Sequence, residues 1–328
     1  MKRRRKQLAA ALAISALLSG CGGAPQEPPE DPEEGGSAVR NPWTADTPIQ
    51  EVIQDPAFGD YGRLLFPTDG AYWSGETLGE LRLTWYSHID PDMTVEIVNT
   101  LRDRALAGET IFYDIYTEEE KAADPAKEDT GLFFFRGEPG ARFAVCSAGG
   151  AFAYVGAMQD SFPHALTLSQ MGYNAFALIY RPGAQTACED LARAITFLFD
   201  HAEELQLDTR CYSLWGGSAG ARMAAWLGTY GPAAFGGDDL PRPGAVIMQY
   251  TGLGEYSPED PPTYACVGDR DGIAPWRVMQ ARLDALSALG TDTEFHCYPG
   301  LGHGFGLGTG TAAEGWIDDA AAFWERQM

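Results

Sequence analysis

The sequence predicts an α/β fold in which a mostly parallel central sheet carries helices on both faces. From residue 131 onward, short apolar runs alternate with longer segments of helical periodicity. The apolar runs lack the period-two polarity of a half-exposed sheet, which indicates strands that are buried on both faces. Glycine-rich loops follow several of these runs, where a parallel sheet collects its ligand-binding residues.

The regular elements can be placed along this second part of the chain. Strands are expected at 131–135, 142–146, 174–180, 211–215, 245–250, 263–267 and 293–298. Helices are expected at 162–171, 188–205, 276–289 and 312–324, and a helical pattern also runs through 221–227. This alternation assigns residues 131–328 to one core domain.

Residues 43–130 are expected to form an N-terminal extension of that core. Alternating or apolar patterns predict strands at 80–86 and 110–116, and apolar spacing predicts a helix at 93–106. The charged stretch 118–129 is interpreted as a solvated helix or loop. The pattern leaves open whether this extension adds strands to the sheet or covers the active site as a lid.

The first residues are typical of an export signal. A basic segment, residues 2–6, precedes an apolar stretch at 8–18 that is too short to span a bilayer comfortably. The following Leu18–Cys21 segment resembles a bacterial lipobox, which implies that residues 1–20 are a lipoprotein signal peptide and that Cys21 is lipidated. An ordinary signal peptide that happens to contain a cysteine is the alternative. Residues 21–42, rich in proline and glutamate, are expected to be a disordered tether.

The lipobox resemblance implies a protein that is exported and lipid-anchored to the outer face of a bacterial cell membrane. A net charge of −23 argues against nucleic acid as a partner and leaves the lipid anchor as the expected membrane contact. No regular metal-binding spacing is present, so neither a metal nor a cofactor is expected. The cysteines other than Cys21 are interpreted as small buried hydrophobes rather than a disulfide framework: Cys146, Cys188, Cys211, Cys266 and Cys297.

The stretch Tyr212–Gly220 contains the strongest candidate for chemistry. An apolar run ends in Gly216-Gly217-Ser218-Ala219-Gly220, and a helical pattern follows. A serine on such a sharp strand-to-helix turn exposes its hydroxyl beside the backbone N–H of the next residue. The alternative is a glycine-rich turn with an idle serine, so Ser218 needs a base, an acid and an anion-stabilising loop elsewhere in the chain.

Three other strand-end loops supply those groups. The loop 147–152 is built of small residues whose N–H groups can face a developing anion. The loop 268–275 offers carboxylates, and the loop 299–306 presents His303 among glycines. Of the other histidines, His88 and His164 precede Ser218 in the chain, His201 is expected at the surface and His296 is expected to be packed within a strand. The order Ser218, Asp271, His303 is the chain order of α/β-hydrolase triads.

The motifs of residues 131–328 resemble bacterial α/β-hydrolase esterases of the acetyl esterase and acetyl-xylan-esterase-like group. The segment 148–152 is similar to their oxyanion loop, with Ala151 in place of the third glycine. The segment Gly268–Pro275 matches their acid loop and selects Asp271 over Asp269. The segment Tyr298–Phe305 is close to their histidine loop. The strand 131–135, the turn 171–176 and the Pro-Pro-Thr approach at 260–264 carry further similarity.

This resemblance implies an α/β-hydrolase fold and a serine carboxylesterase that acts through an acyl-serine intermediate. It implies that Ser218 is the nucleophile, His303 the base and Asp271 the acid. The backbone N–H groups of Ala219 and Gly150 are the implied oxyanion donors, with Gly149 as a third candidate. Short-chain acyl esters, including acetyl groups on extracellular carbohydrate, are the implied substrates. A serine peptidase or amidase of the same fold and a non-catalytic glycan-binding surface lipoprotein are the alternatives.

Overall fold

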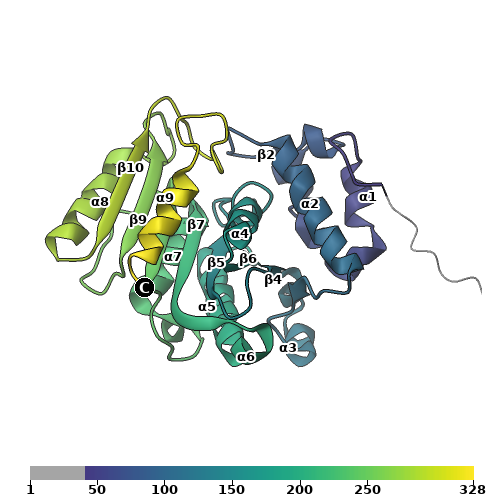
Figure 1. Ribbon diagram of the computed structural model, residues 1–328, viewed down its shortest axis with the longest axis horizontal. Coiled ribbons are helices and arrows are strands. Elements are labelled where there is room, and N and C mark those ends of the chain that lie inside the picture. The colour runs from purple at the N-terminus through teal and green to yellow at the C-terminus, as the bar shows by residue number, and fades with distance from the viewer. Residues whose placement is uncertain (1–40) are drawn as a thin grey trace, which may run out of the picture. The chain divides into compact units, whose positions relative to one another are not determined.

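The computed structural model describes residues 41–328, of which 42–328 form one compact unit (Figure 1). The predictions of a signal peptide, of a lipidated Cys21 and of nearly all of the tether lie outside the described residues. Within the described part of the chain, no helix is both long and apolar enough to cross a bilayer. The five cysteines of this part are all free thiols.

An eight-stranded sheet forms the centre of this unit, in the order β10-β9-β8-β7-β5-β6-β4-β3 (Figure 1). Neighbouring strands from β10 to β6 pair in parallel, whereas β4 pairs antiparallel with β6 and β3 pairs antiparallel with β4. The strands are β3 (Phe112–Tyr113), β4 (Gly131–Phe135), β5 (Arg142–Ser147), β6 (Asn174–Ile179), β7 (Asp208–Gly217), β8 (Ala245–Gln249), β9 (Thr263–Gly268) and β10 (Thr293–Tyr298). The predicted mostly parallel α/β architecture is therefore confirmed.

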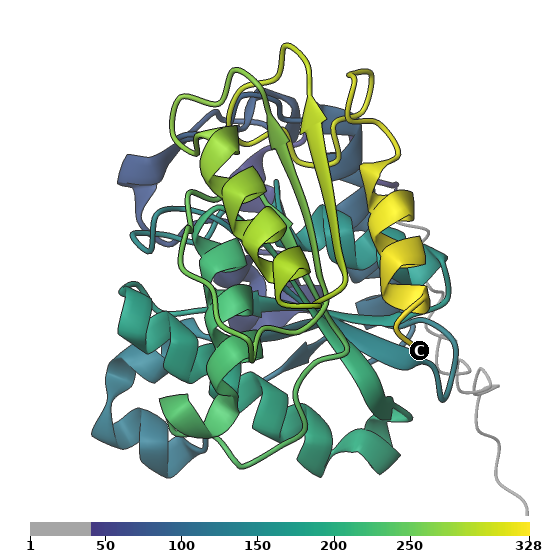
Figure 2. The ribbon, with the colours of Figure 1, turned by 90° about the vertical axis from the view of Figure 1, so that its left-hand side faces the viewer.

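Helices cover both faces of the sheet. They are α4 (Ser161–Gln170), α5 (Ala184–Asp200), α6 (Ala202–Leu205), α7 (Ala219–Tyr230), α8 (Trp276–Ala288) and α9 (Trp316–Glu325). Figure 2 shows α8 and α9 on opposite sides of the β9–β10 end of the sheet. Every residue of β4, β6, β8 and β9 is buried, which explains why these segments are continuous apolar runs without alternation.

Two helix boundaries differ from the predicted ones. The last helix begins at Trp316 rather than at residue 312, because Gly308, Gly310 and Gly315 have positive φ and the chain turns through them first. The helix predicted at 188–205 begins earlier, at Ala184, and breaks at His201 into α5 and α6. Both shifts change a loop that follows the carboxyl end of a strand, since the loop after β10 is longer than predicted and the loop after β6 is shorter.

The segment before the core contributes short elements. They are α1 (Ile49–Ile53), η1 (Pro56–Leu65), η2 (Gly70–Tyr72), β1 (Trp73–Ser74), η3 (Leu78–Glu80), β2 (Arg82–Leu83), α2 (Pro91–Leu106), α3 (Glu118–Ala123) and η4 (Pro125–Asp129). The strand predicted at 80–86 is wrong beyond the two residues of β2, and the one predicted at 110–116 shrinks to β3. Of the two possibilities that the sequence left open, β3 adds a strand to the sheet, and residues 85–86 line a cavity beside Ser218.

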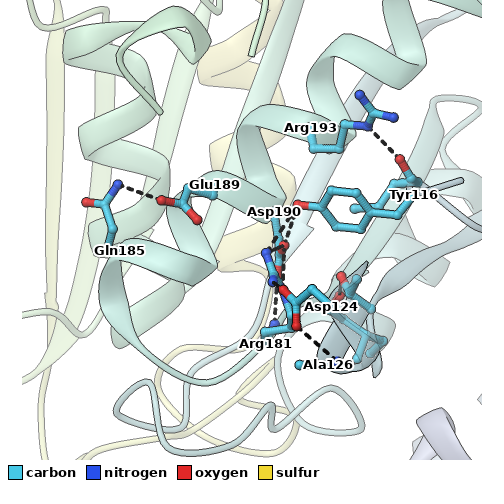
Figure 3. A network of polar contacts seen from close by, with 11 residues as sticks. Tyr116, Asp124, Ala126, Arg181, Gln185, Glu189, Asp190 and Arg193 are labelled. Atoms are coloured by element: carbon cyan, nitrogen blue, oxygen red, sulfur yellow. Dashed lines mark hydrogen bonds and ion pairs between the residues drawn. The ribbon is translucent and has the colours of Figure 1, made fainter. Parts of the chain in front are cut away.

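A polar network joins this segment to the core (Figure 3). The guanidinium of Arg181, two residues after the end of β6, forms a salt bridge of 2.7 Å with Asp190 on α5, and both side chains are buried. Tyr116 donates to the same carboxylate at 2.8 Å, and Asp124 pairs with Arg181 at 2.7 Å. Arg193 on α5 donates to the backbone oxygen of residue 115. These contacts fix the segment around α3 and η4 against α5.

The buried His164 on α4 is expected to make the free energy of unfolding depend on pH. It is fully buried with its ring edge against Trp316, and burial lowers its pKa to about 3 from an ordinary value of 6.5. The unfolded chain therefore binds one more proton than the folded chain between pH 6 and 4. We expect this histidine to cost about 1.4 kcal/mol of unfolding free energy for each pH unit lowered through that range.

The measurement is urea denaturation of wild type and His164→Phe at pH 7, 6, 5 and 4. Because all other titrating groups are shared, the difference between the two proteins should shift in favour of the variant as the pH falls. A difference that is constant from pH 7 to 4 would show that His164 takes up its proton in the native core over the same pH range as in the unfolded chain.

Candidate active site

Ser218 lies at the sharp turn between β7 and α7. Its backbone has φ 51° and ψ −110°, which a residue other than glycine rarely adopts, and its N–H donates to the Gln249 oxygen at 2.8 Å. The flanking glycines are required sterically. A Cβ on Gly216 would lie 2.2 Å from the backbone of Gly220, and a Cβ on Gly220 would lie 2.0 Å from the Ser147 oxygen. The turn therefore exposes a serine that the surrounding backbone holds in a strained conformation.

The structure brings Ser218, His303 and Asp271 into one hydrogen-bonded line. The Nε2 atom of His303 lies 3.0 Å from Ser218 Oγ, and its Nδ1 atom lies 2.8 Å from Asp271 Oδ2. The other carboxylate oxygen, Oδ1, accepts the N–H groups of Ile273 and Ala274 at 2.8 and 2.7 Å. With Oδ1 occupied by its own loop, Asp271 presents Oδ2 to the imidazole. This geometry suits a base that is oriented by a buried acid.

The other candidate groups occupy different places. Asp269 is exposed and accepts the Gly300 N–H at 2.6 Å, so it connects the acid loop to the histidine loop. His296 on β10 pairs with Glu294 at 2.8 Å, and His201 lies beside Phe197. Among residues 41–328, no group of three or more histidine, cysteine, aspartate or glutamate side chains is arranged to hold a metal ion.

The structure of the loop 147–152 corrects the prediction that Gly149 is a candidate oxyanion donor. The Gly149 N–H donates to Asp160 Oδ2 at 2.7 Å and is therefore engaged inside the protein rather than directed at a substrate. The Gly150 N–H has no acceptor within the described residues, and Gly150 lines the same cavity as Ser218 and His303. Ala219 is the first residue of α7, where an N–H has no partner within the helix. The geometry leaves Gly150 and Ala219 as candidate donors.

Asp160 is a buried carboxylate directly behind this loop, and sequence reasoning missed it. It accepts the Gly149 N–H, the Tyr86 hydroxyl at 2.6 Å and the Tyr250 hydroxyl. Complete burial raises the pKa of Asp160, although the three donors and His303 oppose that shift. Burial and the nearby Asp160 charge raise the pKa of Tyr86 and Tyr250 well above the ordinary value, so both hydroxyls remain donors. This cluster connects the oxyanion loop, β8 and the N-terminal segment.

We expect Asp160→Asn to lower kcat/KM for ester hydrolysis by about 10- to 100-fold while the protein still folds. The asparagine NH₂ group is itself a donor and would face the three donors that Asp160 now accepts. The Gly149–Gly150 loop would then lose its fixed position, and the Gly150 N–H would no longer be directed at the cavity. The measurement combines steady-state kinetics with urea denaturation. Asp284→Asn, which changes an exposed carboxylate on α8, is the control. Full activity in a folded Asp160→Asn protein would contradict the assigned positioning role.

Two cavities meet at Ser218. The first, of about 200 Å³, lies on the side of the oxyanion loop and is mostly apolar. It is lined by Trp85, Tyr86, Gly150, Ala151, Ser218, Ile273 and His303. The second, of about 250 Å³, lies along the start of α7. It is lined by Ala151, Phe152, Ser218, Ala219, Arg222, Tyr250, Thr251, Gly252, Ile273, Ala274 and His303. A substrate carbonyl at Ser218 can therefore direct one part of the molecule into each cavity.

The order of the strands, the serine turn and the three-residue line together define an α/β-hydrolase fold. Solved structures with this fold are similar to the chain at 20% identity. An acetyl ester-xyloside bifunctional hydrolase from Caldicellulosiruptor lactoaceticus covers 66% of this chain and 95% of its own, with a TM-score of 0.56. A thermophilic esterase from Thermogutta terrifontis, bound to propionate, covers 66% and 93% with a TM-score of 0.53. An α/β hydrolase from a Medee basin deep-sea metagenome library covers 60% and 92% with a TM-score of 0.52.

A more specific similarity covers the middle of the chain. Residues 139–239, which include the oxyanion loop and Ser218, match the BD-FAE family model. No curated protein sequence matches the chain significantly. The residues before 139, which supply Trp85 and Tyr86, lie outside the matched region, as do Asp271 and His303.

Proposed function

We propose that the protein is a serine carboxylesterase that hydrolyses short-chain acyl esters. The observation that carries this proposal is the hydrogen-bonded line from Asp271 through His303 to Ser218, which opens on a cavity beside an unpaired Gly150 N–H. A serine, a base and an oriented acid at hydrogen-bond distance are the arrangement that nucleophilic acyl transfer needs. The esterases among the structurally similar proteins support the same assignment.

The reaction proceeds in two steps. His303 Nε2 takes the proton from Ser218 Oγ as this oxygen attacks the ester carbonyl, while Asp271 holds the imidazole through Nδ1. The N–H groups of Gly150 and Ala219 stabilise the oxyanion. His303 then passes its proton to the leaving alcohol, and the acyl group remains on Ser218. Water, deprotonated by His303, hydrolyses this acyl-serine and restores the free enzyme.

Carbohydrate acetyl esters on the outside of the cell are the proposed substrates. Trp85, at the cavity beside Ser218, is 44% exposed and is backed by Tyr154, whose ring centroid lies 5.9 Å away. An exposed indole offers an apolar face to a sugar ring. Lipidation of Cys21, which the lipobox resemblance implies, would anchor the enzyme to the outer face of the membrane, within reach of a polymeric substrate. The similar bifunctional hydrolase is described as acting on an acetyl ester and a xyloside.

The test compares a series of p-nitrophenyl acyl esters, an aminoacyl p-nitroanilide and acetylated xylan. We expect acetate and butyrate esters to be hydrolysed faster than longer ones, since the cavity is only about 200 Å³. Acetate should be released from acetylated xylan, and Trp85→Ala should raise KM for the xylan but not for p-nitrophenyl acetate. Hydrolysis confined to the anilide would instead identify a peptidase or amidase. Binding of xylan without any hydrolysis would identify a glycan-binding lipoprotein.

A further inference from the structure

Arg222 is a cation in the second cavity, one helical turn beyond Ser218. Its backbone N–H donates to the backbone oxygen of Ser218 at 3.3 Å, so Arg222 lies in the first turn of α7, close to the Ser218 that precedes the helix. The Arg222 side chain is half-buried and lines the cavity together with Ser218 and His303. Its Nη2 atom lies beside Gly252, where an added Cβ would be 3.8 Å away. The guanidinium therefore faces the space that one part of a bound substrate occupies.

No hydrogen bond or ion pair joins the Arg222 side chain to any residue of the described part of the chain. The carboxylates closest to the nucleophile are already used. Asp271 accepts from His303 and from its own loop, and Asp160 accepts from two tyrosines and Gly149. The other arginines with little solvent exposure, such as Arg181 and Arg282, form ion pairs with buried aspartates. Arg222 thus keeps a guanidinium that lacks an anionic partner.

The remaining lining of this cavity is neutral apart from the catalytic imidazole. It carries no carboxylate, in a protein whose net charge is −23. A half-buried guanidinium loses part of its hydration, and it regains that energy best from a carboxylate, with which it forms two parallel hydrogen bonds. An unpaired cation in an acidic protein, placed beside the nucleophile, is the arrangement expected when the anion arrives with the substrate.

We propose that the substrate is an ester that carries a carboxylate, and that Arg222 binds this group while Ser218 attacks the carbonyl. The inference rests on the proposed esterase function and names its substrate class. The carboxylate can belong to the acyl part, as in a monoester of a dicarboxylic acid, or to the alcohol part, as in an acylated acidic sugar. A single carboxylate at one arginine is compatible with the overall negative charge, which disfavours strongly polyanionic substrates.

Two matched pairs of substrates test the proposal and separate the two sources. For the alcohol side, 4-acetoxybenzoate is compared with its methyl ester, by release of acetate. For the acyl side, phenyl monoadipate is compared with methyl phenyl adipate, by release of phenol. The proteins are the wild type, Arg222→Gln and Arg222→Lys. Arg277→Gln, which removes an exposed charge stacked on Trp276 and outside the cavity, is the control for overall charge.

For each pair, the quantity compared is kcat/KM for the acid divided by kcat/KM for its methyl ester. In at least one pair, we expect this ratio to be about 10- to 100-fold lower in Arg222→Gln than in wild type. Arg222→Lys should retain part of the ratio, and Arg277→Gln, which lies outside the cavity, should retain all of it. The pair that responds identifies the side that carries the carboxylate. Equal ratios for wild type and Arg222→Gln in both pairs would overturn the inference and leave the esterase function standing.

If no ester is hydrolysed, a binding measurement still tests the carboxylate site at Arg222 separately from the proposed esterase function. Isothermal titration calorimetry of Ser218→Ala, with and without Arg222→Gln, is performed with 4-acetoxybenzoate and its methyl ester, and with both members of the adipate pair. Tighter binding of an acid than of its ester, lost on removal of Arg222, would support the carboxylate site even without hydrolysis. The absence of any such preference would refute the site.

Discussion

Replacing Ser218 with alanine is expected to lower kcat for short-chain esters by at least about 10⁴-fold. The substitution removes Ser218 Oγ, which lies 3.0 Å from His303 Nε2, so acyl transfer to this oxygen can no longer occur. A residual rate from the oxyanion donors and from substrate binding should remain. The measurement is kcat and KM for p-nitrophenyl acetate, determined for wild type and variant under the same conditions.

The fold should survive this substitution. Alanine keeps the Cβ atom, so the strain at φ 51° is unchanged, and only the hydroxyl is lost. We therefore expect the urea midpoint to move by little, which makes loss of activity attributable to chemistry. Ser169→Ala is the matched control, since its hydroxyl donates to the Leu166 oxygen on α4, outside the turn that carries Ser218. It should retain wild-type kcat.

Non-additivity provides a sharper form of the same prediction. Residues that act as one catalytic unit lose nearly all of the rate enhancement with the first substitution. The double variant Ser218→Ala/His303→Ala should therefore be about as slow as Ser218→Ala alone. If the second substitution caused a further loss of several orders of magnitude, His303 would be acting on a different nucleophile, and the assignment of Ser218 would have to be abandoned.

The core of the fold could be predicted because its strands are buried on both faces. Continuous apolar runs such as β4 and β6 carry a signal that does not depend on distant contacts. The N-terminal segment gives no such signal. The alternating stretch 80–86 satisfies the strand pattern, yet Trp85 adopts φ 71° and the chain turns there, which directs Trp85 and Tyr86 to the active site. Tertiary contacts, not local propensity, decide that geometry.

The three residues of the hydrogen-bonded line could be selected from sequence because each follows a strand in a short glycine-rich loop. Parallel strands bring such loops to one edge of the sheet, so order along the chain predicts proximity. Asp160 and Arg222 lacked this signal. Asp160 directly precedes α4, and its role depends on hydroxyls from residues 86 and 250. The Gly149 prediction was wrong for the same reason, since its N–H is taken by a carboxylate that only the fold brings close.

Replacing Asp190 with alanine is expected to lower the free energy of unfolding by about 3–5 kcal/mol. The Asp190 side chain is fully buried and accepts the Arg181 guanidinium, the Arg181 backbone N–H and the Tyr116 hydroxyl (Figure 3). Alanine leaves a buried guanidinium without its main partner, and the desolvation that the pair offset is then uncompensated. Urea denaturation at pH 7, followed by tryptophan fluorescence and by circular dichroism, measures the loss.

Glu189→Ala is the matched control, because Glu189 is the preceding residue of α5 and its carboxylate accepts a hydrogen bond from the exposed Gln185 at 3.0 Å (Figure 3). Exposed pairs of this kind contribute little, so we expect a change within about 0.5 kcal/mol.

The double variant Arg181→Met/Asp190→Leu should recover part of the stability lost in Asp190→Ala, since it removes both charges together. If Asp190→Ala lowered the free energy of unfolding as little as Glu189→Ala, the network would not stabilise the fold, and other contacts would hold the N-terminal segment against the core. A large loss, partly recovered in the double variant, would mean that this buried pair stabilises the fold and the contacts of Tyr116 and Asp124 with the core.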